Sequence, residues 1–359
     1  GGMQSVAIIG AGPAGLIAAE TLAGAGCAVT VFDAMPSVAR KFLMAGRGGL
    51  NLTHGEALEA FLGRYRPQAP LLLRAVRGFP PAALVVWCEG LGIETFVGSS
   101  GRVFPKALKA SPLLRAWLGR LGALVVTFRL RHRCVGLAPL RFATPGGAVT
   151  QEADAVVLAL GGASWPRLGS DGGWTSLLPD VAVRPLAPSN VGFVVPWSAR
   201  MAALAGTPLK RIAIGFAGET RRGEAVLTAT GIEGGAIYAL SGPIRDAIAR
   251  EGAATFTLDL RPDLPLDEVR ARLARRSRAE TVSAMLRKGL ALPPASVALV
   301  QEARHGGATA DLATLVKALP LTTRATQGLR RAISTAGGIA WEEVDDRFQL
   351  KRHPGVFVA

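Results

Sequence analysis

A glycine-rich turn between two short apolar runs opens the chain and restricts its fold more than any other feature. Residues 5–9 are apolar after Ser5, and the turn reads Gly10-Ala11-Gly12-Pro13-Ala14-Gly15. Residues 16–25 are rich in Ala and Leu, and a second apolar run covers residues 28–32. Continuous apolar runs of this length are typical of strands buried on both faces of a parallel sheet. The pattern therefore predicts a strand, a helix and a parallel strand, which places the chain in the α/β class.

Each glycine of this turn has a function in dinucleotide binding. Gly10 permits the tight turn, Gly12 lets the backbone approach a pyrophosphate, and Gly15 lets the helix pack closely on the strand. The phosphates would lie at the N-terminus of the helix, where free N–H groups favour anions. Asp33 ends the second run, where a carboxylate accepts hydrogen bonds from ribose hydroxyls. FAD and NAD both use this pattern, and a purely structural glycine turn is the alternative.

Two further glycine-rich segments fit the same site. Residues 45–53 form a second loop that follows Arg40 and Lys41, and such a loop can bring N–H donors and cations to a pyrophosphate or a flavin edge. Residues 155–160 form another apolar run that ends in Gly161-Gly162, where the chain can pass close to a ligand. A flexible surface turn and an ordinary strand-ending turn are the respective alternatives.

Six motifs in chain order carry a family resemblance. They are GAGPAG, AGRGGLNLTH, GRVFPKALKASPLLRAWLGRL, LALGGASWPRLGSDGGW, GIEGGAIYALSGPIRDAI and ISTAGGI. The combination resembles the bacterial YhiN-type FAD flavoproteins, a family that includes aminoacetone oxidase. The match runs from Met3 to the last residue, and its middle motifs are more specific than the glycine turn.

The resemblance implies a Rossmann-like FAD-binding domain of the glutathione-reductase type. Into this α/β domain are inserted a β-rich, barrel-like domain and a small helical domain. The expected bounds are 3–182 and 330–359 for the discontinuous FAD-binding domain, 183–262 for the β-rich domain and 263–329 for the helical insertion. Strand patterns at 191–195, 211–217, 225–230 and 254–260, a charged turn at 219–223 and helical spacing over 266–319 agree with this division.

The resemblance also implies which residues bind FAD. The first loop holds the pyrophosphate, Asp33 the adenosine ribose, and Lys41 with the second loop the flavin-side phosphate and ring. Residues 133–135 and the pair Gly161-Gly162 approach the adenosine half. The whole expected set is Gly10, Ala11, Gly12, Pro13, Ala14, Gly15, Phe32, Asp33, Ala34, Arg40, Lys41, Gly46, Arg47, Gly48, Gly49, Leu50, Asn51, Leu52, Cys134, Val135, Ala159, Leu160, Gly161 and Gly162.

Catalytic side chains are not evident, because a flavin performs hydride and electron transfer itself. The candidates are His54, which follows the second loop, and Glu233, in a segment particular to this branch of the family. A solvent-facing histidine and an acid at a helix start are the alternative interpretations. Trp165 either stacks near the cofactor or packs in the core, and we interpret His132 as structural.

The expected function is that of an FAD-dependent oxidoreductase acting on a small molecule, with an amine or an enone as the substrate and NAD(P)H or oxygen as the redox partner. A flavoprotein associated with RNA and a flavin-binding protein without turnover are the alternatives. The net charge of +15 favours a polyanion, such as RNA, as a binding partner. However, 34 of the 41 basic residues are Arg beside abundant Ala and Gly, as in proteins from G+C-rich genomes. We therefore expect neither a nucleic acid nor a membrane as a partner.

The three cysteines, Cys27, Cys88 and Cys134, lie far apart in the sequence. They form no C-x-x-C pair and no zinc spacing, so we expect no redox dithiol and no metal. Such sparse cysteine usage is typical of a reducing compartment, which predicts a cytoplasmic protein.

In relatives the last strand is followed by a Gly-Glu-x-x-Asp turn, a glycine-rich stretch and a helix that complete the flavin pocket. The given sequence stops at that strand, at residue 359. The resemblance therefore implies weaker FAD binding by this chain than by those relatives.

Overall fold

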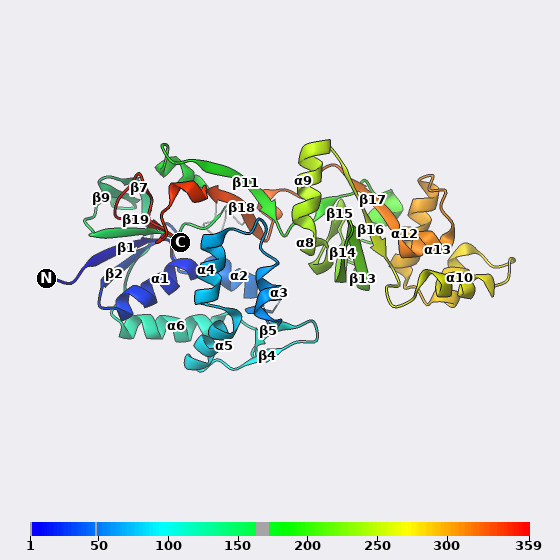
Figure 1. The fold of residues 1–359 in the computed structure, drawn as a ribbon, viewed down its shortest axis with the longest axis horizontal. Helices are drawn as coiled ribbons and strands as arrows, with labels where there is room; N and C mark the ends of the chain where they lie inside the picture. The colour runs from blue at the N-terminus through cyan, green and yellow to red at the C-terminus, as the bar shows by residue number, and fades with distance from the viewer. Residues whose placement is uncertain (1, 47–48, 163–171) are drawn as a thin grey trace. The chain divides into compact units, whose positions relative to one another are not determined.

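The structure is a computed structural model that describes residues 2–46, 49–162 and 172–359 (Figure 1). The chain forms two compact units. Unit 1 contains residues 1–184 and 337–359, and unit 2 contains residues 185–336. Two paired strands, β11 (Val183–Ser189) and β18 (Ser334–Ile339), carry the chain from unit 1 into unit 2 and back.

Unit 1 is built on a five-stranded parallel sheet. Its strands are β1 (Ser5–Ile9), β2 (Ala28–Phe32), β6 (Thr127–Arg129), β10 (Ala155–Leu158) and β19 (Val356–Val358), in the order β19-β10-β1-β2-β6. Helices α1 (Pro13–Gly24) and α6 (Ser111–Ala123) lie side by side against it (Figure 1). Ile8 and Val31 are fully buried, as expected for strands covered on both faces. The predicted α/β class and the Rossmann-type order are confirmed.

Smaller elements complete unit 1. They are α2 (Arg40–Ala45), β3 (Thr53–His54), α3 (Leu58–Leu62), α4 (Pro70–Gly78), α5 (Pro81–Gly90), β4 (Thr95–Val97), β5 (Arg102–Pro105), β7 (Arg133–Leu137), β8 (Leu140–Thr144), β9 (Gly147–Thr150), η3 (Gly173–Leu177) and η6 (Trp341–Glu343). Strands β3, β4 and β5 form one small antiparallel sheet, and β7, β8 and β9 form another. Strands β4 and β5 form a hairpin around residues 98–101, and β8 and β9 form a hairpin around residues 145 and 146.

Residues 70–90 are one apolar stretch that the backbone divides in two. By length and composition alone, the stretch Pro70–Gly90 could cross a membrane. The consecutive prolines at 80 and 81 interrupt it, since Pro80 has no N–H to donate and Pro81 disfavours a helical residue before it. Each resulting helix is far shorter than the roughly 20 residues that a membrane span needs. The cytoplasmic location stays a prediction.

Unit 2 contains a six-stranded antiparallel sheet in the order β12-β15-β14-β13-β16-β17. Its elements are β12 (Phe193–Val194), α7 (Ala199–Ala202), β13 (Pro208–Phe216), β14 (Glu219–Leu227), β15 (Gly231–Glu233), α8 (Gly235–Ala239), α9 (Ser241–Glu251), β16 (Ala254–Asp259) and β17 (Leu319–Thr323). A bridge between Phe193 and Thr326 connects the first strand of this order to the residues that follow the last. The sheet therefore curls back on itself, in the manner of the expected barrel.

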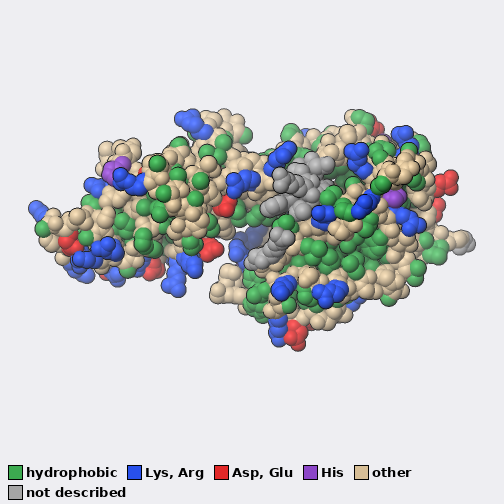
Figure 2. Space-filling view, turned by 180° about the vertical axis from the view of Figure 1, so that it is seen from behind, with side chains coloured by type: hydrophobic (Ala, Val, Ile, Leu, Met, Phe, Trp, Pro, Cys, Tyr) green, Lys and Arg blue, Asp and Glu red, His purple; other side chains and the backbone are tan. Residues whose placement is uncertain are grey.

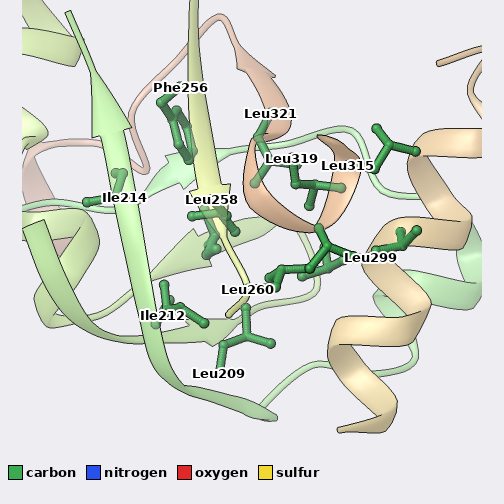
Figure 3. Close-up of a cluster of buried hydrophobic side chains, with 14 of the residues drawn as sticks. Leu209, Ile212, Ile214, Phe256, Leu258, Leu260, Leu299, Leu315, Leu319 and Leu321 are labelled. Carbon is green, nitrogen blue, oxygen red and sulfur yellow. The ribbon is translucent and has the colours of Figure 1, made fainter. Parts of the chain in front are cut away.

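The helical part of unit 2 packs on this sheet. It contains α10 (Leu266–Ala274), α11 (Val282–Ala284), the π-helical turn η4 (Met285–Gly289), α12 (Pro294–His305), α13 (Leu312–Lys317) and the short η5 (Leu329–Arg331). Leu258 of the sheet and Leu299 and Leu315 of the helices belong to one buried cluster (Figure 3). The expected β-rich and helical domains therefore lie in one compact unit, and β17, from the range expected to be helical, belongs to the sheet.

The charged turn expected at residues 219–223 is wrong. The turn lies at Ala217 and Gly218, both with positive φ (50° and 81°), and Phe216 pairs directly with Glu219. Such two-residue hairpin turns need positive φ at both positions, which Gly218 adopts without strain. The charged residues that follow belong to β14, because a strand with an exposed face tolerates them.

Candidate dinucleotide-binding site

A cleft with a volume of about 1420 Å³ lies in unit 1. Its walls include the ends of β1, β2 and β10, the start of α1, helix α2 and the start of β7. In open α/β sheets, ligands bind outside the carboxyl ends of the strands, so this is the position where the fold predicts a ligand.

The three glycines of the first loop differ in what surrounds them. A Cβ atom on Gly10 would lie 2.0 Å from the carbonyl oxygen of Ala159, and a Cβ atom on Gly15 would lie 1.8 Å from that of Gly10. Neither position accepts a side chain. A Cβ atom on Gly12 would have no atom within 4 Å, and Gly12 lines the cleft. Gly10 and Gly15 therefore allow tight packing, whereas Gly12 leaves open space above the backbone.

The first turn of α1 offers unpaired N–H groups at this open space. Gly12 is the N-cap and makes no side-chain cap, and the turn contains no acidic residue. The first N–H groups of a helix have no partner within the helix, so they favour an anion. Lys41 of α2 lines the same cleft, and burial lowers the pKa of its ammonium group. A bound anion would offset that effect.

Asp33 is fixed at the end of β2. Its Oδ2 accepts a hydrogen bond from the N–H of Ala11 (2.7 Å), and its Oδ1 accepts one from the N–H of Met35 (2.8 Å). The carboxylate therefore links the glycine loop to the segment after β2. Lone pairs remain on both oxygens for further donors, such as ribose hydroxyls.

Aromatic rings form another part of the cleft wall. The Phe32 ring stacks on Phe142 with centroids 4.2 Å apart, and the His132 ring lies 5.8 Å from each of them. Cys134 and Val135 of β7 follow along the wall. Burial raises the pKa of the Cys134 thiol, so the thiol is neutral and adds no charge.

Two indole groups indicate that the cleft is built for a ligand. The Nε1 atoms of Trp117 and Trp174 are buried without a hydrogen-bond partner in the described parts of the chain, and both residues line the cleft. A third indole there, Trp87, donates to the Glu20 carboxylate. A buried donor without a partner costs about 1–3 kcal/mol. With the open Gly12 and the cationic Lys41, these donors fit an anionic, aromatic dinucleotide.

The structure gathers most of the expected set at this cleft. The expected residues that line it are Gly10, Gly12, Pro13, Ala14, Phe32, Asp33, Ala34, Arg40, Lys41, Leu50, Asn51, Leu52, Cys134, Val135, Ala159, Leu160 and Gly161.

Ala11, Gly15, Gly46, Gly49 and Gly162 lie outside the lining. Gly46, for example, packs on Ala110, which a Cβ atom would approach to 2.5 Å. Arg47, Gly48 and Trp165 fall outside the described residues.

The two catalytic candidates do not lie in this lining. His54 is in β3, where its Nδ1 accepts from the N–H of Glu56 and its Nε2 donates to the carbonyl of Ser100. Both ring nitrogens are thereby used in the hairpin. Glu233 belongs to unit 2 and lies 4.0 Å from the guanidinium of Arg331.

Sequence reasoning missed several aromatic residues of the cleft. Phe79 lies in the turn before α5, Trp87 in α5 and Trp117 in α6. The apolar spacing of these two helices looks like that of ordinary core helices. His132 carried a usable signal, because it comes three residues after the end of strand β6, at the carboxyl edge of the sheet. Trp174 lies in η3 and ends the fourth family motif, LALGGASWPRLGSDGGW, so the motif was a signal that could have placed it at the site.

Fold and site together define a Rossmann-type nucleotide-binding protein. The family model described as HI0933-like protein Rossmann domain matches residues 4–359. The chain belongs to this family, which confirms the resemblance to YhiN-type flavoproteins.

Similarity to individual proteins is more distant. The chain is 27% identical over 248 residues to the ribosomal RNA dihydrouridine synthase of Haemophilus influenzae, and the match covers 65% of this chain and 60% of that relative. Among solved structures, a 3-ketosteroid-Δ4-(5α)-dehydrogenase from Rhodococcus jostii is 15% identical with a TM-score of 0.48, covering 99% of this chain and 90% of that chain. The open conformation of a flavocytochrome c3 fumarate reductase is 16% identical with a TM-score of 0.46, covering 99% and 72%.

Proposed function

We propose that the chain binds FAD in the unit 1 cleft and acts as an FAD-dependent oxidoreductase on a small-molecule substrate. The observation that carries this proposal is the meeting of three groups at one cleft: the open start of α1, the Asp33 carboxylate and the Lys41 ammonium. Each is complementary to one part of an adenine dinucleotide.

In this proposal the residues act as binding and orienting groups. The N–H groups of the first α1 turn and Lys41 bind the diphosphate, and Asp33 accepts from the adenosine ribose. Ala159, Leu160 and Gly161 pass beside the adenosine half at the end of β10. Leu50, Asn51 and Leu52 line the cleft where the flavin half is expected.

When bound, FAD supplies two-electron hydride transfer, so the chain needs no redox side chain of its own. An amine or an enone is the proposed substrate class, with NAD(P)H or oxygen as the second redox partner. The cleft wall formed by Phe79, Leu84 and Trp87 offers apolar surface to such a substrate.

The test is a fluorescence titration of the purified protein with FAD, followed by anaerobic reduction. We expect saturable binding, and bleaching of the flavin absorbance by NADH, NADPH or one member of a panel of amines. Failure to bind FAD under any condition would refute the proposal. Bound flavin that no reductant bleaches would leave a flavin-binding protein without turnover.

A second candidate is a flavoenzyme that acts on RNA. The relative from Haemophilus influenzae is named for modification of ribosomal RNA, and this chain has a net charge of +15. Lys and Arg side chains are spread over the face in Figure 2 rather than gathered in one tract. An RNA-acting enzyme would bind RNA with an affinity that falls steeply with salt. Absence of RNA binding at low salt would eliminate this candidate.

A further inference from the structure

Two aromatic residues of the cleft have unused polar atoms and no role in the expected set. They are His132, which follows β6, and Trp174, which lies in η3. Both line the cleft, and both border the ring cluster of Phe32 and Phe142.

The hydrogen bonds of His132 fix its tautomer. Its Nδ1 lies 2.7 Å from the carbonyl oxygen of Leu130, which can only accept, so Nδ1 carries the hydrogen. In the neutral ring Nε2 is then an acceptor. Within the described residues Nε2 has no partner. The backbone N–H of His132 also donates to the carbonyl of Asp33 (2.8 Å), which holds the ring at the ribose end of the cleft.

Trp174 contributes the complementary group. Its Nε1 can only donate, and it is buried without a partner in the part of the chain that the structure describes. Helix η3 contacts β7, the strand that begins directly after His132. An unused donor and an unused acceptor therefore border the same aromatic cluster.

Other side chains at this end of the cleft cannot replace them. Ala34, Met35 and Val135 are apolar, and Arg133 only donates. The remaining lone pairs of Asp33 are assigned to the ribose hydroxyls in the proposed FAD site. Among the described side chains of residues 32–35 and 132–136, His132 therefore supplies the one neutral nitrogen acceptor.

We propose that His132 and Trp174 recognise the edge of the adenine ring, an inference that rests on the proposed FAD site. The amino group at C6 of adenine donates to Nε2 of His132, and a ring nitrogen of adenine accepts from Nε1 of Trp174. Hypoxanthine has an oxygen at C6, and this acceptor would face the acceptor Nε2 of His132. The site therefore prefers adenine over hypoxanthine by roughly ten- to a hundredfold.

The experiment measures binding of ADP and of inosine diphosphate to the purified chain by calorimetry, with FAD as competitor. The wild type should bind ADP at least about tenfold more tightly. H132F keeps a ring against Phe32 and Phe142 but removes the acceptor, so it should lose this preference. W174F should weaken ADP binding by about tenfold. H305F changes an exposed histidine of unit 2 and should match the wild type.

Thermal unfolding of each variant separates a binding defect from a folding defect. If H132F does not fold, H132Q, whose amide oxygen still accepts, should retain the preference for ADP. Equal binding of ADP and inosine diphosphate by a wild type that binds FAD would overturn the inference and leave the proposed function standing. A wild type that binds neither FAD nor ADP would instead refute the proposed function.

Discussion

Each unit contains a glycine-rich segment that runs from a strand into a helix, called a turn below, and the two differ in what surrounds their glycines. In unit 1, Gly10 and Gly15 pack against backbone while Gly12 faces open space. In unit 2, Gly231 and Gly234 precede α8, and both are enclosed. A Cβ atom on Gly231 would lie 1.9 Å from the carbonyl oxygen of Phe193, and one on Gly234 would lie 2.9 Å from Cα of Ala225.

The comparison shows that glycine spacing alone does not identify a ligand site. Both turns use glycine because a neighbouring backbone comes too close for a side chain. Only the unit 1 turn also exposes a helix start beside a cleft, where backbone N–H groups can meet an anion. The unit 2 turn brings β15 against β12 and β14 in the sheet and belongs to the packing of its core.

The largest expected effect is that of Gly231→Ala. The added methyl group overlaps the backbone of β12, which cannot move without breaking the sheet. We expect the free energy of unfolding to fall by at least about 3 kcal/mol. Urea denaturation followed by circular dichroism measures it. A variant as stable as the wild type would show that this turn is not a packing device.

Asp33→Asn should have the next largest effect. An amide has one oxygen where the carboxylate has two, so its NH2 group must face one of the two backbone N–H donors. The loss should be about 1–3 kcal/mol of stability. Hydrogen exchange at the amides of Ala11 and Met35 should accelerate in the variant. Unchanged exchange would contradict the proposed link between the two segments.

Lys41→Met tests the charge at the open turn. Burial lowers the pKa of Lys41 in the free protein, and a bound diphosphate would raise it. Between the two pKa values, binding takes up a proton, so FAD affinity should fall as pH rises through the free-state pKa. The variant should bind about tenfold more weakly at pH 7 and lack this slope.

Dissociation constants measured from pH 7 up to 10.5, the ordinary pKa of lysine, give the comparison, with the exposed Lys109→Met as the matched control. A pH slope retained by Lys41→Met would assign the titration to another group.

Gly12→Ala should have the smallest effect on stability. The new methyl group meets no atom, so the free energy of unfolding should change by less than about 0.5 kcal/mol. FAD binding should nevertheless weaken, because the methyl group occupies the space above the helix start. A stability loss as large as that of Gly231→Ala would remove the distinction between the two turns.

Much of unit 1 could be predicted from its sequence. Strands β1 and β2 and the helix between them follow from local patterns, because a strand buried on both faces must be apolar throughout. Prediction was weaker where packing selects the structure. For example, β17 (Leu319–Thr323) lies within residues 263–329, where a helical insertion was expected.

The sequence by itself determined that a tight glycine-rich turn joins the first strand to the first helix, since the pattern is local and Gly15 packs on the backbone of Gly10. Tertiary structure alone decided which other residues reach the cleft. Trp87, Trp117 and Trp174 come from separate segments, and their spacing resembles that of core residues. Whether an aromatic side chain faces a core or a cleft depends on what packs opposite it, and the folded chain alone sets that.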